Sequence, residues 1–326
     1  MKKDKKILGV VFVVVLWLSM MFGGLAFAQE KFPSQGFTLI VSWTAGGGQD
    51  MVARGLAPIL EKNLGQNVAV KNTPGGGGSI GFMEAMRAKP DGYTIVQFSP
   101  SISILPYMMK TDVFYTKYDP IAYGGYSPGS IMVRTESPFK TIKDFLDYAK
   151  ANPGKVRVGN TGFGSIGHML AIDIERAAKL KFIHVPYKGG APSFTAALGG
   201  HIDCVAAWVG DAYPLVQGKK LRVLAVTAPV RNKFVPDAPT FKELGINSEV
   251  ITGYAWAAPK GIPKDRMNIL YNAFKKSLES AGFAKYADDQ GATITIKNPE
   301  EYGKFLVDQD KFWKELIQGA GLDKTQ

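Results

Sequence analysis

The sequence predicts an α/β fold that contains a parallel sheet. Short, continuous apolar runs with the length of buried strands recur along the chain, and amphipathic stretches of helical length separate them. In four places a glycine-rich turn joins such a run to the following helix, and this repeated order is typical of parallel sheets. These glycine turns comprise residues 43–50, 72–79, 160–165 and 187–191.

The first part of the chain contains two glycine turns and the strands around them. Strands are expected at residues 37–42, 67–71 and 93–98. Aspartate is favoured at N-caps, so we expect Asp50 to cap a helix that runs to about Leu64, with a kink or interruption at Pro58. A second helix is expected from Ser79 to about Lys89.

The middle of the chain begins with an irregular segment. Residues 106–128 are rich in tyrosine and show no regular period, so we expect a passage between domains, followed by a strand at 130–134. Thr141-Ile-Lys-Asp144 has the pattern of a capping box, and Ser165 is expected to cap another helix. Further strands are expected at residues 156–158, 182–185, 202–207 and 221–227.

The last part of the chain is more helical. Residues 240–243 have the pattern of a further capping box, and Asn298 precedes a final helix. An amphipathic helix is expected over residues 264–280, and short strands at 254–259 and 293–296. The inward-facing residues of the final helix are expected to be Phe305, Phe312 and Leu316.

The N-terminus has the pattern of a secretory signal peptide over residues 1–28. Four lysines precede an apolar run at 7–18, and Ala26-Phe27-Ala28 is a small-residue cleavage site. An uncleaved anchor is the alternative, because the apolar character extends almost to Ala28. Cleavage leaves about 298 residues and lowers the formal net charge from +11 to +8, because four lysines and one aspartate are lost. With one cysteine no intrachain disulfide can form, and this pattern favours the periplasm.

No enzyme motif is complete in the sequence. Residues 75–79 lack the lysine of a P-loop, and residues 160–167 lack the full glycine pattern of a dinucleotide site. The three histidines have no spacing typical of metal ligands, and we expect no metal, cofactor or catalytic site. Ser165 and His168 could form a nucleophile and a base, but Ser165 fits a helix cap better. Cys204 lies in an apolar strand and is expected in the core.

The glycine turns are the best candidates for a functional site. Each lies between the carboxyl end of a strand and the amino end of a helix, where ligands bind in open parallel sheets and free N–H groups attract anions. The basic excess fits an anionic ligand, whereas no lysine and arginine cluster is dense enough for a nucleic-acid surface. Asp50 leaves alternatives open, because it can cap its helix, bind through water or meet an ammonium group of the ligand.

An ordered series of motifs resembles the Bug family (TctC-like), the extracytoplasmic solute-binding receptors of tripartite tricarboxylate transporters. The series spans essentially the whole chain after the signal region. Thr73 and Trp43 depart from residues common in the family, and both can alter the ligand. The matching segments are residues 45–50 with Arg54, 74–78, 90–94, 152–154, Gly164-Ser165 with His168, 184–189, 199–203, 221–227, Arg231, 236–243 and 258–263.

The resemblance implies a two-domain periplasmic binding protein of type II, the Venus-flytrap class, in which the chain crosses between domains twice. We place domain 1 at residues 29–130 and 230–326, and domain 2 at residues 131–229. The implied function is that of a receptor, not an enzyme, which captures a small carboxylate in the interdomain cleft and delivers it to membrane permease subunits. The ligand can be a di- or tricarboxylate, an aromatic acid or an acidic amino acid, and we expect a monomer without a nucleic-acid partner.

The resemblance also implies the ligand-binding residues. Loops 45–50 and 161–168 are expected to hold a ligand carboxylate from opposite domains, partly through ordered water. Two alternatives remain, a periplasmic sensor with a signalling partner and a hydrolase that uses Ser165 and His168. The expected ligand-binding residues are Trp43, Ala45, Gly46, Gly47, Gly48, Asp50, Gly78, Ser79, Ser99, Thr161, Gly164, Ser165, His168, Tyr187, Trp208 and Asp211.

Overall fold

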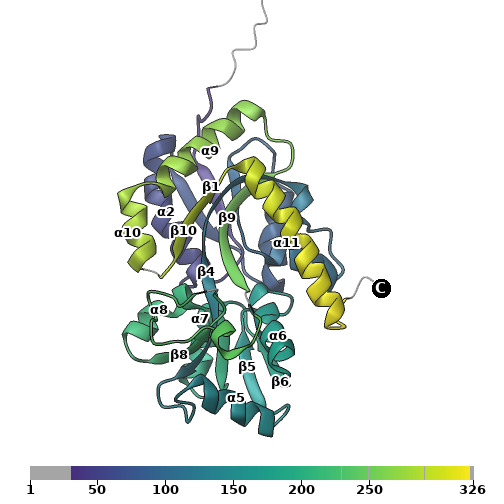
Figure 1. The fold of residues 1–326 in the computed structure, drawn as a ribbon. Helices are drawn as coiled ribbons and strands as arrows, with labels where there is room; N and C mark the ends of the chain where they lie inside the picture. The colour runs from purple at the N-terminus through teal and green to yellow at the C-terminus, as the bar shows by residue number, and fades with distance from the viewer. Residues whose placement is uncertain (1–30, 229, 249, 290, 324–326) are drawn as a thin grey trace, which may run out of the picture. The chain divides into compact units, whose positions relative to one another are not determined.

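One mixed sheet organises the fold (Figure 1). The computed structural model describes residues 31–228, 230–248, 250–289 and 291–323, so the expected signal peptide lies outside the described residues. Within the described chain the sheet has ten strands: eight follow the order β2-β1-β3-β9-β4-β7-β5-β6, and the other two, β8 and β10, each pair with β4. The strands are β1 (Phe37–Val41), β2 (Val68–Asn72), β3 (Thr94–Phe98), β4 (Tyr118–Arg134), β5 (Val156–Asn160), β6 (Phe182–Pro186), β7 (Cys204–Trp208), β8 (Leu221–Val226), β9 (Ile251–Pro259) and β10 (Thr293–Lys297).

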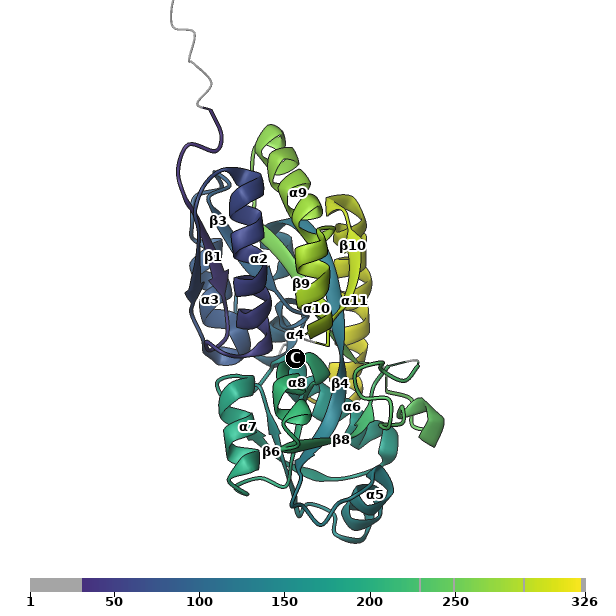
Figure 2. The ribbon, with the colours of Figure 1, turned by 90° about the vertical axis from the view of Figure 1, so that its left-hand side faces the viewer.

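Helices connect most of these strands, and α2 packs against α9 (Figure 2). None of the described helices has both the length and the apolar character needed to cross a membrane. The helices are α2 (Gly48–Leu64), α3 (Ser79–Met86), α4 (Ser101–Met108), α5 (Ile142–Ala151), α6 (Ile166–Ala178), α7 (Gly190–Leu198), α8 (Val209–Gln217), α9 (Lys264–Leu278), α10 (Ala281–Asp289) and α11 (Pro299–Gly319), with short 3₁₀ turns η1 (Gly76–Gly78), η2 (Tyr115–Lys117) and η3 (Lys242–Leu244).

The expected parallel pairing holds where strands and glycine turns alternate. β1 pairs in parallel with β2 and β3, and β5 pairs in parallel with β6 and β7. The long strand β4 pairs antiparallel with β7, β8, β9 and β10, which makes the sheet mixed. The α/β class predicted from the sequence is therefore confirmed, and its parallel units are joined by antiparallel strands.

Strand β4 corrects the expected irregular passage at residues 106–128. It begins at Tyr118 and continues to Arg134, and nearly all of its residues are buried or half-buried on both faces. Continuous burial removes the alternation of polar and apolar residues by which a strand is normally found. The sequence also contains Pro120 and Gly125, but both lie at shifts in the register with β9, where the ladder tolerates such residues.

The change of partners along β4 divides the sheet into two halves. Residues 118–128 of β4 pair with β9, and the β1 half comprises this segment with β1, β2, β3, β9 and β10. Residues 129–134 pair with β7 and β8, and the β5 half comprises this segment with β5, β6, β7 and β8. The chain passes between the halves along β4 and again between β8 and β9. The domain boundaries at 130/131 and 229/230 stay a prediction.

Several expected helix starts are confirmed and others are corrected. Capping boxes at Thr141 and Asn298 are present, whereas residues 240–243 begin only the short turn η3. Asp50 is not an N-cap, because α2 begins at Gly48 and has Gly47 as its cap. The helix continues through Pro58 without interruption. Helices α4 and α10 have no counterpart in the prediction.

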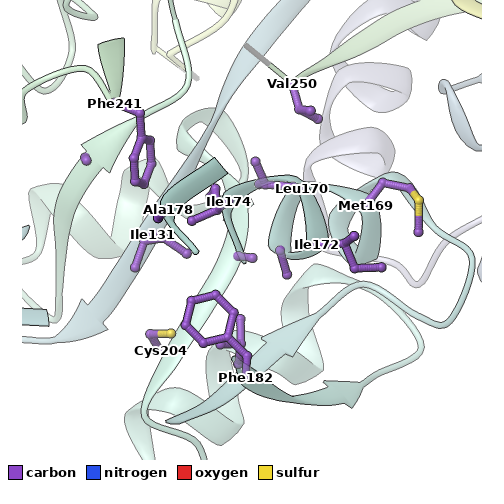
Figure 3. Close-up of a cluster of buried hydrophobic side chains, with 14 of the residues drawn as sticks. Ile131, Met169, Leu170, Ile172, Ile174, Ala178, Phe182, Cys204, Phe241 and Val250 are labelled. Carbon is purple, nitrogen blue, oxygen red and sulfur yellow. The ribbon is translucent and has the colours of Figure 1, made fainter. Parts of the chain in front are cut away.

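The apolar core contains the residues that link strands β4, β5 and β7 to helix α6. Ile131, Leu170 and Phe182 belong to this cluster, and Cys204 lies in it with no exposed surface, as expected (Figure 3). In α11 the expected inward face is partly wrong, because Phe312 is 43% exposed. Trp313, the next residue, is buried in its place.

Candidate functional site

Loops from both halves of the sheet enclose two adjoining chambers. The outer chamber has a volume of about 580 Å³, and the inner one has about 20 Å³. Trp43 and Thr161 line both chambers and therefore form the boundary between them. The outer chamber is lined by Ser42, Trp43, Thr44, Gly75, Gly76, Gly77, Gly78, Met109, Thr161, Gly162, Phe163, Pro186, Tyr187, Lys188 and Pro192. The inner chamber is lined by Trp43, Gly47, Gly48, Gln49, Ser99, Thr161, Ile166, Gly190, Trp208, Asp211 and Thr252.

The glycines of these turns allow loops from opposite halves to approach closely. A Cβ atom on Gly77 would lie 2.5 Å from the Phe163 carbonyl oxygen, and one on Gly189 would lie 2.6 Å from Thr44 Oγ1. A Cβ atom on Gly48 would lie only 1.7 Å from Asp211 Oδ1. Glycine is therefore required at these three positions for the two halves to make contact. This requirement is separate from any role of glycine in exposing backbone N–H groups.

The first turns of four helices reach the inner chamber. Gly48 begins α2, Ile166 begins α6, Gly190 begins α7, and Asp211 lies in the first turn of α8. The amino end of a helix carries a partial positive charge, so these helices favour negative charge in the chamber. The Ile166 N–H already donates to Ser101 Oγ at 3.0 Å, a hydrogen bond that joins the two halves.

Asp211 is the one ionisable side chain among the described residues that line the inner chamber. Its Oδ1 atom is buried and has no hydrogen-bond partner among the described residues. Burial raises the pKa of the Asp211 carboxyl to about 7, and the Gly48 N–H only partly opposes this rise. The side chain can therefore be neutral near physiological pH and act as a hydrogen-bond donor.

Asp50 is held by its own loop. Its carboxylate accepts hydrogen bonds from the Gly46 N–H at 2.9 Å, Arg54 Nε at 3.0 Å and Asn72 Nδ2 at 2.8 Å. Burial disfavours the charged form of Asp50, but these three donors outweigh it and lower the pKa below the usual value. The geometry gives Asp50 a loop-fixing role, which is not among the alternatives that the sequence left open.

Asp50→Asn tests this interpretation. The substitution removes the charge that Arg54 and the Gly46 N–H bind, so we expect the free energy of unfolding to fall by about 1 to 3 kcal/mol at neutral pH. A lowered pKa stabilises the fold at pH values above the unfolded value, so the loss should shrink as the pH falls below about 4 and through the lowered pKa of Asp50. Thermal melts at pH 7 and at about pH 2 to 3 measure both effects. A selective loss of amino-acid ligands, with unchanged melting, would instead place Asp50 against a ligand ammonium group.

Ser165 acts as the expected N-cap of α6. Its Oγ atom accepts a hydrogen bond from the His168 N–H at 3.3 Å and lies 2.9 Å from Thr161 Oγ1. The imidazole Nδ1 of His168 accepts from the Gly164 N–H at 3.3 Å, and burial, followed by the neighbouring His184, lowers the pKa of His168 to about 4. The His168 imidazole thus forms a hydrogen bond with the backbone of its own turn, and the Ser165 hydroxyl caps helix α6.

The predicted ligand-binding residues fall into two groups, and their role stays a prediction. Residues that line a chamber are Trp43, Gly47, Gly48, Gly78, Ser99, Thr161, Tyr187, Trp208 and Asp211. Residues that line neither chamber are Ala45, Gly46, Asp50, Ser79, Gly164, Ser165 and His168. Five further residues line a chamber but were not predicted from the sequence: Gln49, Met109, Phe163, Lys188 and Thr252. Phe163 and Lys188 lie inside the predicted glycine turns, and this position was a signal for them. Met109 directly follows helix α4, which the sequence did not predict.

Comparison with known proteins identifies the family. The tripartite tricarboxylate transporter family receptor, TctC, matches residues 52–322. A UPF0065 protein encoded in the gbd 5' region of Cupriavidus necator is 34% identical over 307 residues, with 91% of each chain covered. The structure of periplasmic binding protein BugD has a TM-score of 0.86 at 30% identity, covering 90% of this chain and 99% of that one. The R. palustris protein Rpa4515, solved with adipate, has a TM-score of 0.84 at 25% identity, covering 89% and 98%.

These matches extend over most of the chain and agree with the series of motifs in the sequence. They also confirm the fold class, because BugD, a periplasmic binding protein, has the same fold as this chain. The chain therefore belongs to the TctC receptor family and is a solute-binding receptor of the Bug type.

Proposed function

We propose that this receptor binds a small carboxylate between the two halves of the sheet. The observation that supports this proposal is the inner chamber, where the first turns of four helices meet and the lining side chains carry no cation. Oriented helix ends bind carboxylate oxygens without a positively charged side chain. A related protein of the same fold was solved with adipate, a dicarboxylate.

The receptor delivers its ligand to the permease subunits of a tripartite transporter, and it works in the periplasm. The family description names such a transporter, and the relative BugD is a periplasmic binding protein. The two halves correspond to two domains that close when the ligand makes contacts with both, which shifts the population to the closed form. Close contacts through Gly48, Gly77 and Gly189 belong to that closed form.

A thermal-shift screen followed by titration calorimetry tests carboxylate binding. Each carboxylate is paired with its neutral amide, for example adipate with adipamide and benzoate with benzamide. We expect stabilisation by one or more carboxylates and at least tenfold weaker binding of the matching amide, because the amide lacks the charge that the helix ends favour. Stabilisation by neutral sugars alone, or equal binding of acid and amide, would contradict the proposal.

A further inference from the structure

The outer chamber has an aromatic and apolar lining. The side chains of Trp43, Phe163 and Tyr187 line it from three different loops, and Met109, Pro186 and Pro192 add further apolar surface. Phe163 is 45% exposed although it faces this chamber. An exposed aromatic side chain at the wall of a concave site is surface that a bound apolar group can cover.

Trp43 is held rigidly between the two chambers. Its indole packs edge-on against Phe82, with ring centroids 5.8 Å apart, and only 6% of the residue is exposed. A Cβ atom on Gly78 would lie 3.3 Å from Trp43 Cζ2, so this glycine turn runs directly along the indole ring. Contact with Phe82 and with the turn at Gly78 holds the indole as a wall of the chamber, which suits a flat ligand better than a flexible side chain would.

Size and polarity together restrict what can occupy the outer chamber. A volume of about 580 Å³ lies in the range of pockets that enclose drug-sized molecules. Lys188 is the one cation among the described residues that line this chamber, so a second or third carboxylate of a short polar acid would lose its hydration against Trp43, Phe163 and Tyr187 and gain few charged partners. Two hydroxyl oxygens of the lining, Ser42 Oγ and Thr44 Oγ1, are buried without hydrogen-bond partners among the described residues and can accept or donate to a single polar substituent.

We propose that the ligand of this receptor is a carboxylate with an aromatic-sized apolar body, whose carboxylate occupies the inner chamber and whose body lies against Trp43, Phe163 and Tyr187. The inference rests on the proposed function and adds the class of the ligand. Trp43 and Thr161, which line both chambers, lie where the carboxylate joins the body. The outer chamber therefore determines specificity for the apolar part of the ligand.

Calorimetry with four probes tests the ligand class: benzoate, phenylacetate, adipate and citrate. We expect an aromatic acid to bind at least tenfold more tightly than adipate and citrate. Phe163→Ala should weaken the aromatic acid about tenfold and adipate less than twofold, because it removes contact area for the body only. Phe312→Ala is the matched control, since Phe312 is also exposed (43%) but lines a separate groove. Melting temperatures of both variants verify their folding.

The outcomes separate the two proposals. If adipate or citrate binds at least as tightly as the aromatic acids, the ligand class is wrong and carboxylate binding still stands. If none of the four acids binds, both proposals fail. If Phe163→Ala and Phe312→Ala have the same effect on an aromatic acid, the placement of the ligand body in the outer chamber is wrong.

Discussion

Gly48→Ala is expected to lower the affinity for the ligand about 10- to 100-fold. The added methyl group would lie 1.7 Å from Asp211 Oδ1, far inside van der Waals contact. Forcing an extra methyl group into a packed contact typically costs about 1 to 3 kcal/mol, which corresponds to this loss of affinity. Gly48 lies in α2 and Asp211 in α8, so separation of the halves relieves the clash and the cost falls on the closed form. Calorimetry measures the affinity, and thermal melting of the free protein should change little.

Two variants make this experiment specific. Gly47→Ala is the matched control, because its Cβ atom would meet only the Thr44 carbonyl oxygen at an ordinary 3.4 Å, and we expect it to bind within about threefold of the wild type. Gly48→Ala combined with Asp211→Gly removes the clashing carboxyl, so the double variant should bind no worse than Asp211→Gly alone. Equal losses in Gly47→Ala and Gly48→Ala would show that the contact between Gly48 and Asp211 does not limit binding.

Structural features that depend on residues close together in the sequence could be predicted from it. Features that depend on residues far apart in the sequence could not. The caps at Thr141, Ser165 and Asn298 depend on residues within a few positions of each other, and all three are present. Strand β4 depends on partners up to 174 positions further along the chain, as between Tyr123 and Lys297, and its burial on both faces hides the strand period. Helix α4 likewise has no amphipathic signal, because it is buried on most sides and its buried residues include serines as well as apolar residues.

The candidate site shows the same limit. The sequence located the glycine turns, because glycine runs between strands and helices are visible without a structure. Their contact with the opposite half is not visible, so the close approach of Gly77 to Phe163 and of Gly189 to Thr44 was missed. The chambers collect residues from segments more than 200 positions apart, such as Gln49 of α2 and Thr252 of β9, which no local pattern relates.

The two aspartates near the turns illustrate how the environment decides a role. Asp50 is the third residue of α2 and Asp211 is the third residue of α8, so both occupy the same helical position. Asp50 has Arg54 four residues later and forms an ion pair with it, whereas Asp211 has Leu215 at that spacing. None of the described residues that line the inner chamber is a cation, so the charge of Asp211 depends on what enters the chamber.

We expect the affinity for a carboxylate ligand to fall as the pH rises from 6 to 8. Burial raises the pKa of Asp211 to about 7, so its carboxyl is neutral at pH 6 and donates a hydrogen bond to the ligand carboxylate. Above the raised pKa the carboxyl is ionised and repels the ligand, and the affinity should decrease by up to about tenfold per pH unit. Closure of the protein without ligand should depend on pH in the same direction. Because enclosure raises the pKa of Asp211, closure takes up a proton at pH values between the usual aspartate pKa and about 7, and it becomes less favourable as the pH rises.

Asp211→Asn removes this titration and keeps the size of the side chain. Its affinity for the carboxylate should stay nearly constant from pH 6 to 8 and remain close to the wild-type value at pH 6, since the amide also donates a hydrogen bond. Asp112→Asn, at an exposed position, serves as the control and should keep the pH dependence of the wild type. Affinity that rises with pH and is lost in Asp211→Asn would mean that Asp211 meets a cationic group, because only an ammonium gains from the ionised carboxylate. The direction in which affinity changes with pH thus distinguishes a plain carboxylate ligand from an amino acid. The sequence left this question open and pointed to Asp50 as the residue that would meet an ammonium group.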